Sequence, residues 1–235
     1  NELVGAGFKN RMGQKTVNTL ESAVFINEGD HFSRHPLPDK VQFSAALHAG
    51  IADYINDGSE DIFISQNFFQ VPSKMPRLDA GRGLWLKGNG EAEFEPVSGQ
   101  VSGVRAYGEQ RGAALSDFNR DGKVDLAVAQ NDATTKLYIN RVSKSGLSVR
   151  LSGPPSNRAG IGSSIRLVYP DDSKGPRREV QAGSGYWSQG GLTQVLGYSR
   201  YPDQIEVTWF DGTVQVIEVS DSRKKYDIEY RNGGE

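Results

Sequence analysis

Short apolar runs separated by glycine, asparagine, aspartate and proline recur along the chain, and they predict strands. One pattern occurs twice, at 49–64 and at 112–129: a strand of small residues, an aspartate-rich loop and a second apolar strand. Another pattern, an apolar triplet followed by an Asn/Gly turn and an aromatic residue, occurs at 24–32 and 84–94. It is typical of a β-hairpin, and its first half occurs again at 137–140.

Together the two patterns form a repeated unit, and the two aspartate loops begin 64 residues apart, at Asp53 and Asp117. Four strands in about sixty residues predict the blade of a β-propeller. Small entry strands suit the crowded axis of such a fold. Residues 1–22 resemble the remnant of a preceding unit, and two loops cannot close a ring. We therefore expect residues 1–142 to be the C-terminal part of a larger propeller.

The pattern changes at residue 143, where a linker-like break precedes short alternating strands. These strands are expected at 147–151, 165–169, 178–182, 193–196, 205–209 and 214–219, with a last one in the tail at 221–235. Glycine, aspartate and proline turns separate them. The pattern predicts a compact β-sandwich or barrel over 143–235, without helices. The whole chain is therefore expected to be all-β.

Composition narrows the possible functions. The 235 residues include 28 glycines, which fits a turn-rich β protein, and no cysteine. Disulfides, a thiol nucleophile and a zinc-thiolate site are therefore excluded. A net charge of -2 argues against nucleic acid and acidic membranes as partners, and no apolar run reaches membrane-spanning length. Because the chain begins at Asn1 rather than methionine, earlier removal of a targeting segment is compatible with the sequence.

The second aspartate loop, 117–125, carries the strongest chemical signal. Oxygen-bearing side chains stand at its first, third, fifth and ninth positions, with glycine at the sixth: Asp117, Asn119, Asp121, Asp125 and Gly122. Carboxylates held this close repel one another, and a hard divalent cation ringed by oxygens relieves the repulsion. We therefore expect bound Ca²⁺, with Lys123 giving its backbone carbonyl and pointing its charge outward. The alternative is a polar hairpin turn without metal.

The first loop repeats this frame with Asp53, Asp57, Ser59 and Asp61. Its third position is Ile55, which offers no side-chain oxygen, so this site is expected to be weaker or completed by water. Neither loop is an EF-hand, because strands flank both of them. In addition, Val128 occupies the twelfth position of the second loop, where the EF-hand has glutamate.

Other candidate residues lie in loops. Long insertions present possible contact residues, namely Phe68, Phe69, Arg77 and Asp79 in one, and Arg105 and Tyr107 in another. Equally, Phe68 and Phe69 could pack under their own loop. The three histidines, His31, His35 and His48, are expected to be structural or at the surface. No serine lies in a nucleophile-elbow frame, and no glycine-rich loop precedes a helix.

Three aromatic residues of the C-terminal region invite a ligand interpretation, because aromatic faces beside glycines can stack on sugars. We nevertheless expect Tyr186, Trp187 and Trp209 to be core residues, most firmly Trp209, whose strand alternates. Gln189, beside the same turn, could satisfy buried backbone groups.

The frame D-x-[DN]-x-D-G-x-x-D, complete at 117–125 and one ligand short at 53–61, resembles FG-GAP (VCBS) repeats. That resemblance implies integrin α-like propeller blades, Ca²⁺ between the first two strands of a blade, and a scaffold or adhesion role. Residues 157–162, 178–180, 183–189 and 207–212 are similar to the ASPIC/UnbV domain of the cartilage acidic protein-like family, which follows such repeats. Phe210 and the Leu196-Gly197-Tyr198 stretch depart from that family's usual pattern.

The first functional hypothesis is a non-enzymatic calcium-binding module, secreted, periplasmic or on the cell surface, that binds a protein or glycan. A rival hypothesis is the accessory region of a larger secreted enzyme, which a pocket gathering His48, Asp79 and Arg105 would favour. A third is subunit assembly, with upstream blades or another chain completing the ring. No catalytic residue, nucleic-acid partner or membrane span is expected.

Overall fold

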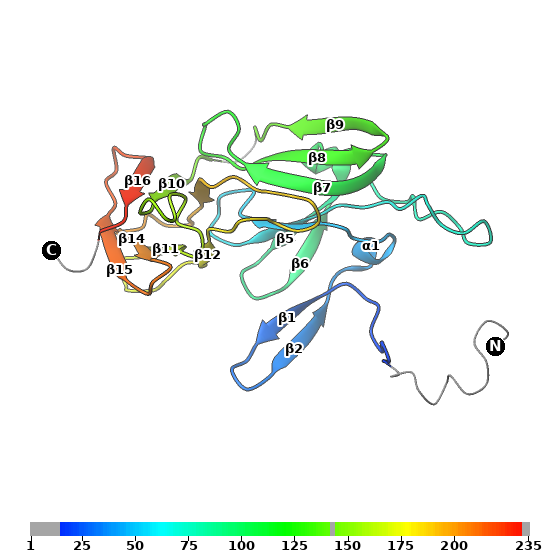
Figure 1. Ribbon diagram of the computed structural model, residues 1–235, viewed down its shortest axis with the longest axis horizontal. Helices are drawn as coiled ribbons and strands as arrows, with labels where there is room; N and C mark the ends of the chain where they lie inside the picture. Colours follow the sequence, from blue (N-terminus) through cyan, green and yellow to red (C-terminus); the bar gives the residue numbers. More distant parts are fainter. Residues whose placement is uncertain (1–14, 142–143, 232–235) are drawn as a thin grey trace.

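The computed structural model describes residues 15–141 and 144–231, and over these ranges the protein is all-β apart from two four-residue helices (Figure 1). The sequence-based predictions for residues 1–14, for the start of the linker at 142–143 and for the tail at 232–235 lie outside the described residues. Figure 1 shows the N-terminal sheets on one side and the C-terminal strands on the other. No helix in the described ranges has the length and apolar character that a membrane crossing requires.

The N-terminal half begins with the predicted hairpin, β1 (Ala23–Asn27) and β2 (Phe32–Pro36), followed by helix α1 (Asp39–Gln42). Next comes a four-stranded antiparallel sheet in chain order: β3 (Ala49–Ala52), β4 (Asp61–Ile64), β5 (Leu84–Gly88) and β6 (Phe94–Val97). Ala52 pairs with Asp61, so the first aspartate loop is the connection between β3 and β4. The predicted four-strand unit therefore forms a single sheet.

The second unit contains helix α2 (Gly99–Ser102) and three antiparallel strands, β7 (Glu109–Ser116), β8 (Asp125–Asn131) and β9 (Ala133–Tyr138). Ser116 pairs with Asp125, which places the second aspartate loop between the first two strands, as in the first unit.

The two larger sheets of the N-terminal half share a hydrophobic core. Phe63 and Trp85 of the first sheet pack with Ala113, Leu126 and Val128 of the second. This core contains both second strands, β4 and β8, and β3 also lies beside β7. Face-to-face packing of successive meanders is the geometry a propeller uses, but the sheets of the described residues do not close into a ring. A closed propeller therefore stays a prediction.

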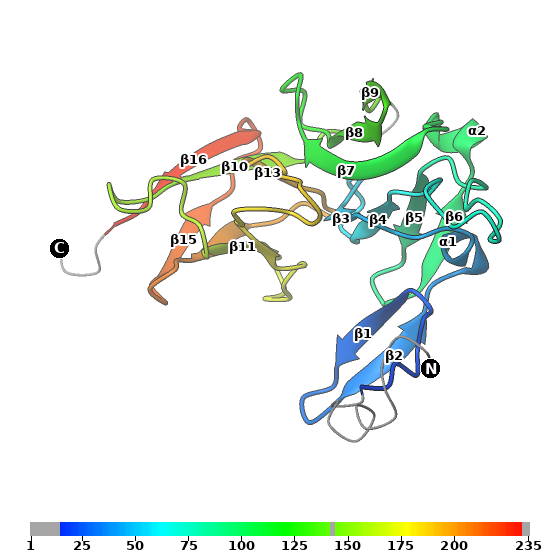
Figure 2. The ribbon, with the colours of Figure 1, turned by 45° about the vertical axis from the view of Figure 1, so that its right-hand side comes forward.

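The C-terminal region consists of two sheets facing each other across one core (Figure 2). One sheet has the order β13–β10–β16 and the other β12–β11–β14–β15. The strands are β10 (Leu147–Ser152), β11 (Ser164–Val168), β12 (Arg178–Glu179), β13 (Gln194–Leu196), β14 (Gln204–Thr208), β15 (Val214–Glu218) and β16 (Lys225–Glu229). Trp209 is buried in the core between them, as expected. The sequence predicted either a β-sandwich or a barrel. The structure has the β-sandwich, because neither sheet closes on itself.

One strand is shorter than the sequence pattern predicted. The alternation at 178–182 indicated a five-residue strand, but β12 ends at Glu179. The chain then leaves the sheet through Gly183 and Gly185, whose φ angles of 100° and 109° are incompatible with a strand. The outgoing segment, residues 181–193, is a long excursion that we call the docking loop.

Candidate calcium loops at the junction of the two halves

The two aspartate loops are built by the same hydrogen bonds, position for position. In each loop the first aspartate accepts from the backbone N–H groups of the fifth and sixth positions, at 3.0 and 2.7 Å for Asp53 and at 2.9 and 2.8 Å for Asp117. The aspartate at the fifth position accepts from the N–H two residues later, at 2.9 Å for Asp57 and 3.1 Å for Asp121. A repeat inferred from sequence is thus a repeat in three dimensions.

The ninth position completes the shared pattern. Asp61 accepts from the N–H of the loop's second residue at 2.8 Å, and Asp125 does the same at 2.9 Å. The second oxygen of Asp61 accepts from Gly88, the last residue of β5, at 2.9 Å, and that of Asp125 accepts from Asn140, two residues after β9, at 2.8 Å. Each ninth-position aspartate therefore ties its loop to the third strand of its own sheet.

Backbone conformation repeats as well. The fourth position has a positive φ in both loops, 53° at Asn56 and 63° at Arg120. The glycine at the sixth position has φ of 97° at Gly58 and 79° at Gly122, which residues with a Cβ adopt only with strain. The glycine of the sequence frame is thus required by the turn itself.

The loops differ at the third position and in what surrounds them. Asn119 accepts from the Asp121 N–H at 3.1 Å and donates to the Asp121 carboxylate at 3.1 Å, which Ile55 cannot do in the first loop. The Lys123 ammonium lies 3.8 Å from the Asp121 carboxylate. Its charge therefore folds back towards the loop, where the sequence analysis expected it to point outward, because Asp121 is the nearest compensating charge.

Whether these residues suit a calcium ion depends on their oxygens. In the described ranges, no three Asp, Glu or His side chains gather as a metal-holding group, because the carboxylates turn towards backbone N–H groups. Each carboxylate oxygen still has a second lone pair, and the donor set is all oxygen apart from the Asn119 amide nitrogen. Side-chain oxygens at four positions plus a backbone carbonyl have the chemistry that Ca²⁺ prefers, so the second loop fits the ion by donor type.

The first loop contains two buried carboxylates, whereas the second has one, Asp125. Asp53 and Asp61 are both buried, and burial raises the pKa of Asp53 to about 7 and that of Asp61 to about 6, against the opposing effect of their backbone hydrogen bonds. Buried carboxylates are costly to ionise, and the nearby Arg178 guanidinium lowers the pKa of Asp53 by less than burial raises it. A bound cation would offset that cost.

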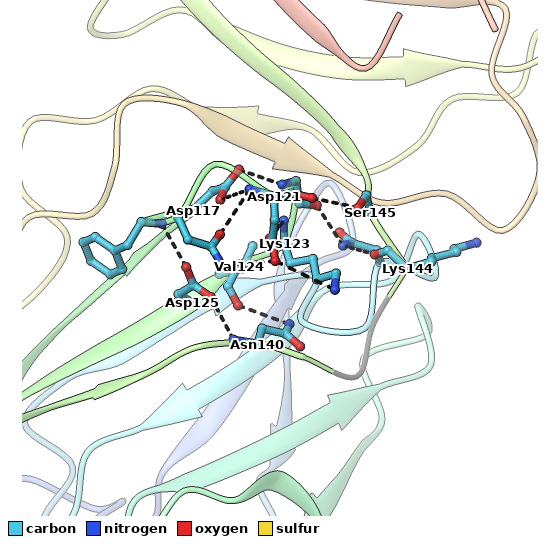
Figure 3. Close-up of polar contacts among 12 residues, drawn as sticks. Asp117, Asp121, Lys123, Val124, Asp125, Asn140, Lys144 and Ser145 are labelled. Carbon is cyan, nitrogen blue, oxygen red and sulfur yellow. Dashed lines mark hydrogen bonds and ion pairs between the residues drawn. The ribbon is translucent and has the colours of Figure 1, made fainter. Parts of the chain in front are cut away.

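Two asparagines join the loops to each other. The buried Asn56 side chain of the first loop donates to the carbonyl of Gly122 in the second at 3.3 Å and to that of Lys144 at 2.7 Å. Asn140 donates to the carbonyl of Val124 at 3.2 Å (Figure 3) and to that of Tyr54 at 2.8 Å, and so spans both loops. The sequence analysis missed both residues. The recurrence of asparagine after the apolar triplet, at Asn27 and Asn140, was the available signal for the second.

The C-terminal region rests on both loops. Gly146 donates to the Gly122 carbonyl at 2.8 Å, and Ser145 donates to the Asp121 carbonyl at 2.7 Å. On the first loop, Gly197 lies so close to Asp53 that a Cβ at this position would be 1.9 Å from the carboxylate. The loops are thus the platform on which the second half of the chain sits.

An ion pair also joins the N-terminal and C-terminal halves at this junction. Arg178 binds the Glu60 carboxylate through two hydrogen bonds of 2.7 Å and also donates to the Val195 carbonyl at 2.8 Å. The two side chains are only 11% and 25% exposed. Glu60 is the eighth residue of the first aspartate loop, a position to which the calcium frame assigns no role, so the sequence analysis did not select it.

The remaining candidates of the sequence analysis are dispersed. Phe68 and Phe69 are half-buried. The guanidinium of Arg77, in their own loop, lies over Phe69 at 4.2 Å, which agrees with packing beneath that loop, whereas Phe68 lies under Arg111 of β7 at 5.2 Å. The Arg77–Asp79 ion pair is exposed. Arg105 and Tyr107 are exposed on the connection before β7, and His31 and His35 are exposed on the first hairpin, whereas His48 is buried.

Two aromatic residues contradict the core assignment. Trp187 is 92% exposed and Tyr186 is 48% exposed, because they lie at the tip of the docking loop and not in the sandwich. The same loop holds Gln189, whose side chain accepts from the Gly183 N–H and donates to the Gln181 carbonyl at 3.2 Å, but these backbone groups are exposed and not buried as suggested. Trp187 also has φ of 47°, a strained value for a residue with a side chain.

Comparison with known proteins gives a class for the second half. Residues 153–235, about a third of the chain, match the family model described as ASPIC and UnbV. The chain is thus an all-β protein that carries an ASPIC/UnbV domain behind sheets with repeated aspartate loops. It is also similar to cartilage acidic protein 1 of Xenopus tropicalis, with 23% identity over 131 residues. That match covers 56% of this chain and 18% of the relative.

Proposed function

We propose that this chain is part of a non-enzymatic extracellular scaffold, in which calcium-binding loops of propeller-type blades support the ASPIC/UnbV domain and the assembled surface binds a protein or glycan. The observation that carries the proposal is that the first, fifth and ninth positions make the same hydrogen bonds in two loops 64 residues apart, both in contact with the C-terminal half. A turn needs a single Asx bond, whereas the second loop keeps side-chain oxygens at all four side-chain positions of the frame and the first loop at every one except Ile55.

Calcium would be held in the second loop by Asp117, Asn119, Asp121, Asp125 and the Lys123 carbonyl, and in the first by Asp53, Asp57, Ser59 and Asp61. The ion would supply positive charge where the loops concentrate carboxylates, and so couple metal binding to folding. Ile55 removes one donor from the first loop, so its affinity is the lower of the two. The loop residues themselves position the C-terminal half.

Several observations support a role without catalysis. The cavity beside His48 is not lined by Asp79 or Arg105, the residues that the enzymatic alternative required there. Neither the ASPIC and UnbV description nor the name of the relative refers to an enzymatic activity. The relative is named for cartilage, which is in keeping with an extracellular location.

A second candidate function, assembly, is favoured by one feature. The hairpin β1–β2 repeats the pattern of β5–β6, yet in the described residues it forms a two-stranded sheet where β5–β6 belong to a four-stranded one. The outer edge of β1 therefore offers unpaired backbone groups to further strands. Sedimentation of the chain over a concentration series would show self-association if another copy supplies those strands, and a constant monomer mass would contradict this candidate.

Thermal unfolding with and without calcium tests the main proposal. At a hundredfold excess over the dissociation constant, Ca²⁺ should add about 2.7 kcal/mol to the unfolding free energy. Asp121→Asn keeps an Asx acceptor but removes a charged donor, so it should reduce the gain. Asp211→Asn is the matched control, because Asp211 forms the same turn bond, to Thr213 N–H at 2.9 Å, outside both loops. A calcium response equal in Asp121→Asn and the parent would refute the assignment.

A further inference from the structure

A cavity of about 710 Å³ lies between the first sheet and the docking loop. Its volume is in the range of small-molecule binding sites. On the side of the N-terminal half it is lined by apolar residues that include Ile51, Ile62 and Phe94. On the other side the wall is polar, with Ser184, Gln189 and Gln194 of the C-terminal half.

His48 is the unusual member of this wall. The residue is 2% exposed, and neither ring nitrogen has a hydrogen-bond partner among the residues that the structure describes. Its backbone is firmly placed, because its N–H donates to the Ser65 hydroxyl at 2.8 Å and its carbonyl accepts from the Ser65 N–H at 2.9 Å. A buried polar group without a partner is costly and calls for a compensating role.

The chain makes room for this imidazole from both sides. A Cβ on Gly50 would be 2.9 Å from the Nε2 of His48, and a Cβ on Gly185 would be 2.8 Å from its Nδ1. Gly185 belongs to the docking loop and has φ of 109°. The hydroxyl of its neighbour Ser184 is likewise buried and has no partner in the described ranges. Two side chains with unsatisfied polar atoms thus lie beside the same cavity, one from each half of the protein.

The chemistry of these groups selects a class of ligand. Burial lowers the pKa of His48, so at neutral pH the ring is uncharged and offers one N–H donor and one bare acceptor. The Ser184 hydroxyl also donates and accepts. A carboxylate or phosphate supplies acceptors alone and an ammonium supplies donors alone, whereas hydroxyl groups supply both.

The charge and the shape of the cavity also favour a ligand with hydroxyl groups and no net charge. Arg178 on the cavity wall is already paired with Glu60, and the neighbouring Arg177 and Glu179 carry opposite charges. The wall therefore has no net charge that would select an ion. The apolar side of the cavity suits the carbon face of a sugar ring, and the exposed rings of Tyr186 and Trp187 stand on the same loop as Ser184.

Hydrogen bonds hold the docking loop against β7, and they fix the position of its tip. The Ala113 N–H of β7 donates to the Ser188 hydroxyl at 3.1 Å, and the Gly191 N–H donates to the Leu115 carbonyl at 2.9 Å. Figure 1 shows this gold segment reaching out from the C-terminal strands to lie alongside β7. Strain at an exposed tryptophan, with φ of 47°, is a feature that functional loops retain.

We propose that this cavity binds a neutral saccharide, with His48 and Ser184 hydrogen bonding to the hydroxyls of one sugar unit while Trp187 stacks on the adjoining unit. The proposal rests on the partner-binding part of the proposed function, for which it names a site and a ligand class. It does not require calcium in either loop.

Tryptophan fluorescence gives a direct test, because Trp85 and Trp209 are buried and Trp187 is exposed. Acrylamide quenching therefore reports on Trp187. We would titrate a panel of neutral disaccharides of glucose, galactose, mannose and N-acetylglucosamine into the chain, once with Ca²⁺ and once with chelator. At least one disaccharide should protect Trp187 from quenching, since stacking covers the ring.

Variants connect the protection to the cavity. Ser184→Ala and His48→Phe should each weaken binding about tenfold, the loss expected for a hydrogen bond worth 1.4 kcal/mol. Tyr107→Ala, which removes an exposed aromatic residue remote from the cavity, should bind like the parent. Because Ser184→Ala deletes one hydroxyl from a loop, it keeps the test valid even if His48→Phe does not fold.

Three results would overturn the proposal: no protection by any neutral disaccharide, protection that is unchanged in Ser184→Ala, or protection by acidic or amino sugars alone. Comparing the titrations with Ca²⁺ and with chelator separates the saccharide proposal from the proposal that the aspartate loops bind calcium. Binding that persists in chelator, in a chain whose melting does not respond to Ca²⁺, would refute the calcium loops and leave the saccharide site standing. A calcium response without any saccharide binding would refute the saccharide site and leave the calcium loops standing.

Discussion

The ion pair between Arg178 and Glu60 should hold the two halves of the chain together, and replacing Arg178 with glutamine tests this. Glutamine keeps much of the side-chain length but removes both 2.7 Å hydrogen bonds to the carboxylate and the bond to Val195. Breaking a fully buried pair costs about 3–5 kcal/mol. The Glu60 side chain is 25% exposed, so solvent weakens this pair. We therefore expect the unfolding free energy to fall by about 2–3 kcal/mol.

Urea unfolding followed by tryptophan fluorescence and circular dichroism measures this loss, and a thermal melt should show a fall in Tm of about 4–12 °C. The matched control is Arg200→Gln. Arg200 binds Asp171 with the same two-pronged geometry, at 2.7 and 2.8 Å, but the side chains are 48% and 55% exposed and both lie in the C-terminal half. Solvent already screens that pair, so the control should unfold like the parent.

A double-mutant cycle with Glu60→Gln isolates the pair itself, and we expect a coupling energy of about 1–2 kcal/mol between the two sites. If Arg178→Gln unfolds at the same urea concentration as Arg200→Gln, the junction is not held by this ion pair. The same conclusion follows if the cycle gives no coupling.

Further predictions concern the same junction. Asn56→Ala should lower the unfolding free energy by about 2–3 kcal/mol, since it removes both buried hydrogen bonds and leaves a positive φ on alanine; a loss below 0.5 kcal/mol in urea unfolding would contradict the bridging role. Gly197→Ala should cost about 1–3 kcal/mol, because its methyl group would collide with Asp53, and parent-like melting would show that the contact is not tight. His48 has a lowered pKa, so below about pH 6.5 the unfolded chain takes up this proton more readily than the folded chain, and the contribution of His48 to stability should decrease as pH falls, whereas the raised pKa values of Asp53 and Asp61 act in the opposite direction. His48→Phe should therefore lose less stability than the parent between pH 7.5 and 5.5, and equal losses would argue against a buried neutral ring.

The sequence predicted the strands well because their signals are local. Asp53 and Asp117 begin frames that the structure folds identically, and the glycines at 58 and 122 stand where a positive φ requires them. Trp209 is buried as its alternating strand indicated. In each case the information lies within a few neighbouring residues, which is the range over which periodicity and turn chemistry act.

The features that the sequence did not predict depend on contacts between distant segments of the chain. Trp187 was assigned to the core from its aromatic character, but its position follows from the docking loop lying on β7, some 75 residues earlier in the chain. Glu60 and Arg178 are 118 residues apart, and no local pattern pairs them. The role of Asn56 also became visible only when the two loops were seen side by side.

The central claim is that the aspartate loops bind calcium, and isothermal titration of Ca²⁺ into the chelator-treated chain tests it most directly. The account predicts one stronger site, lost in Asp121→Ala, and one weaker site, lost in Asp53→Ala, because Ile55 deprives the first loop of a donor. Replacing Ile55 with aspartate should strengthen the weaker site. An absence of binding heat in the parent chain, together with an unchanged melting temperature, would show that both frames are hydrogen-bonded turns and contradict the account.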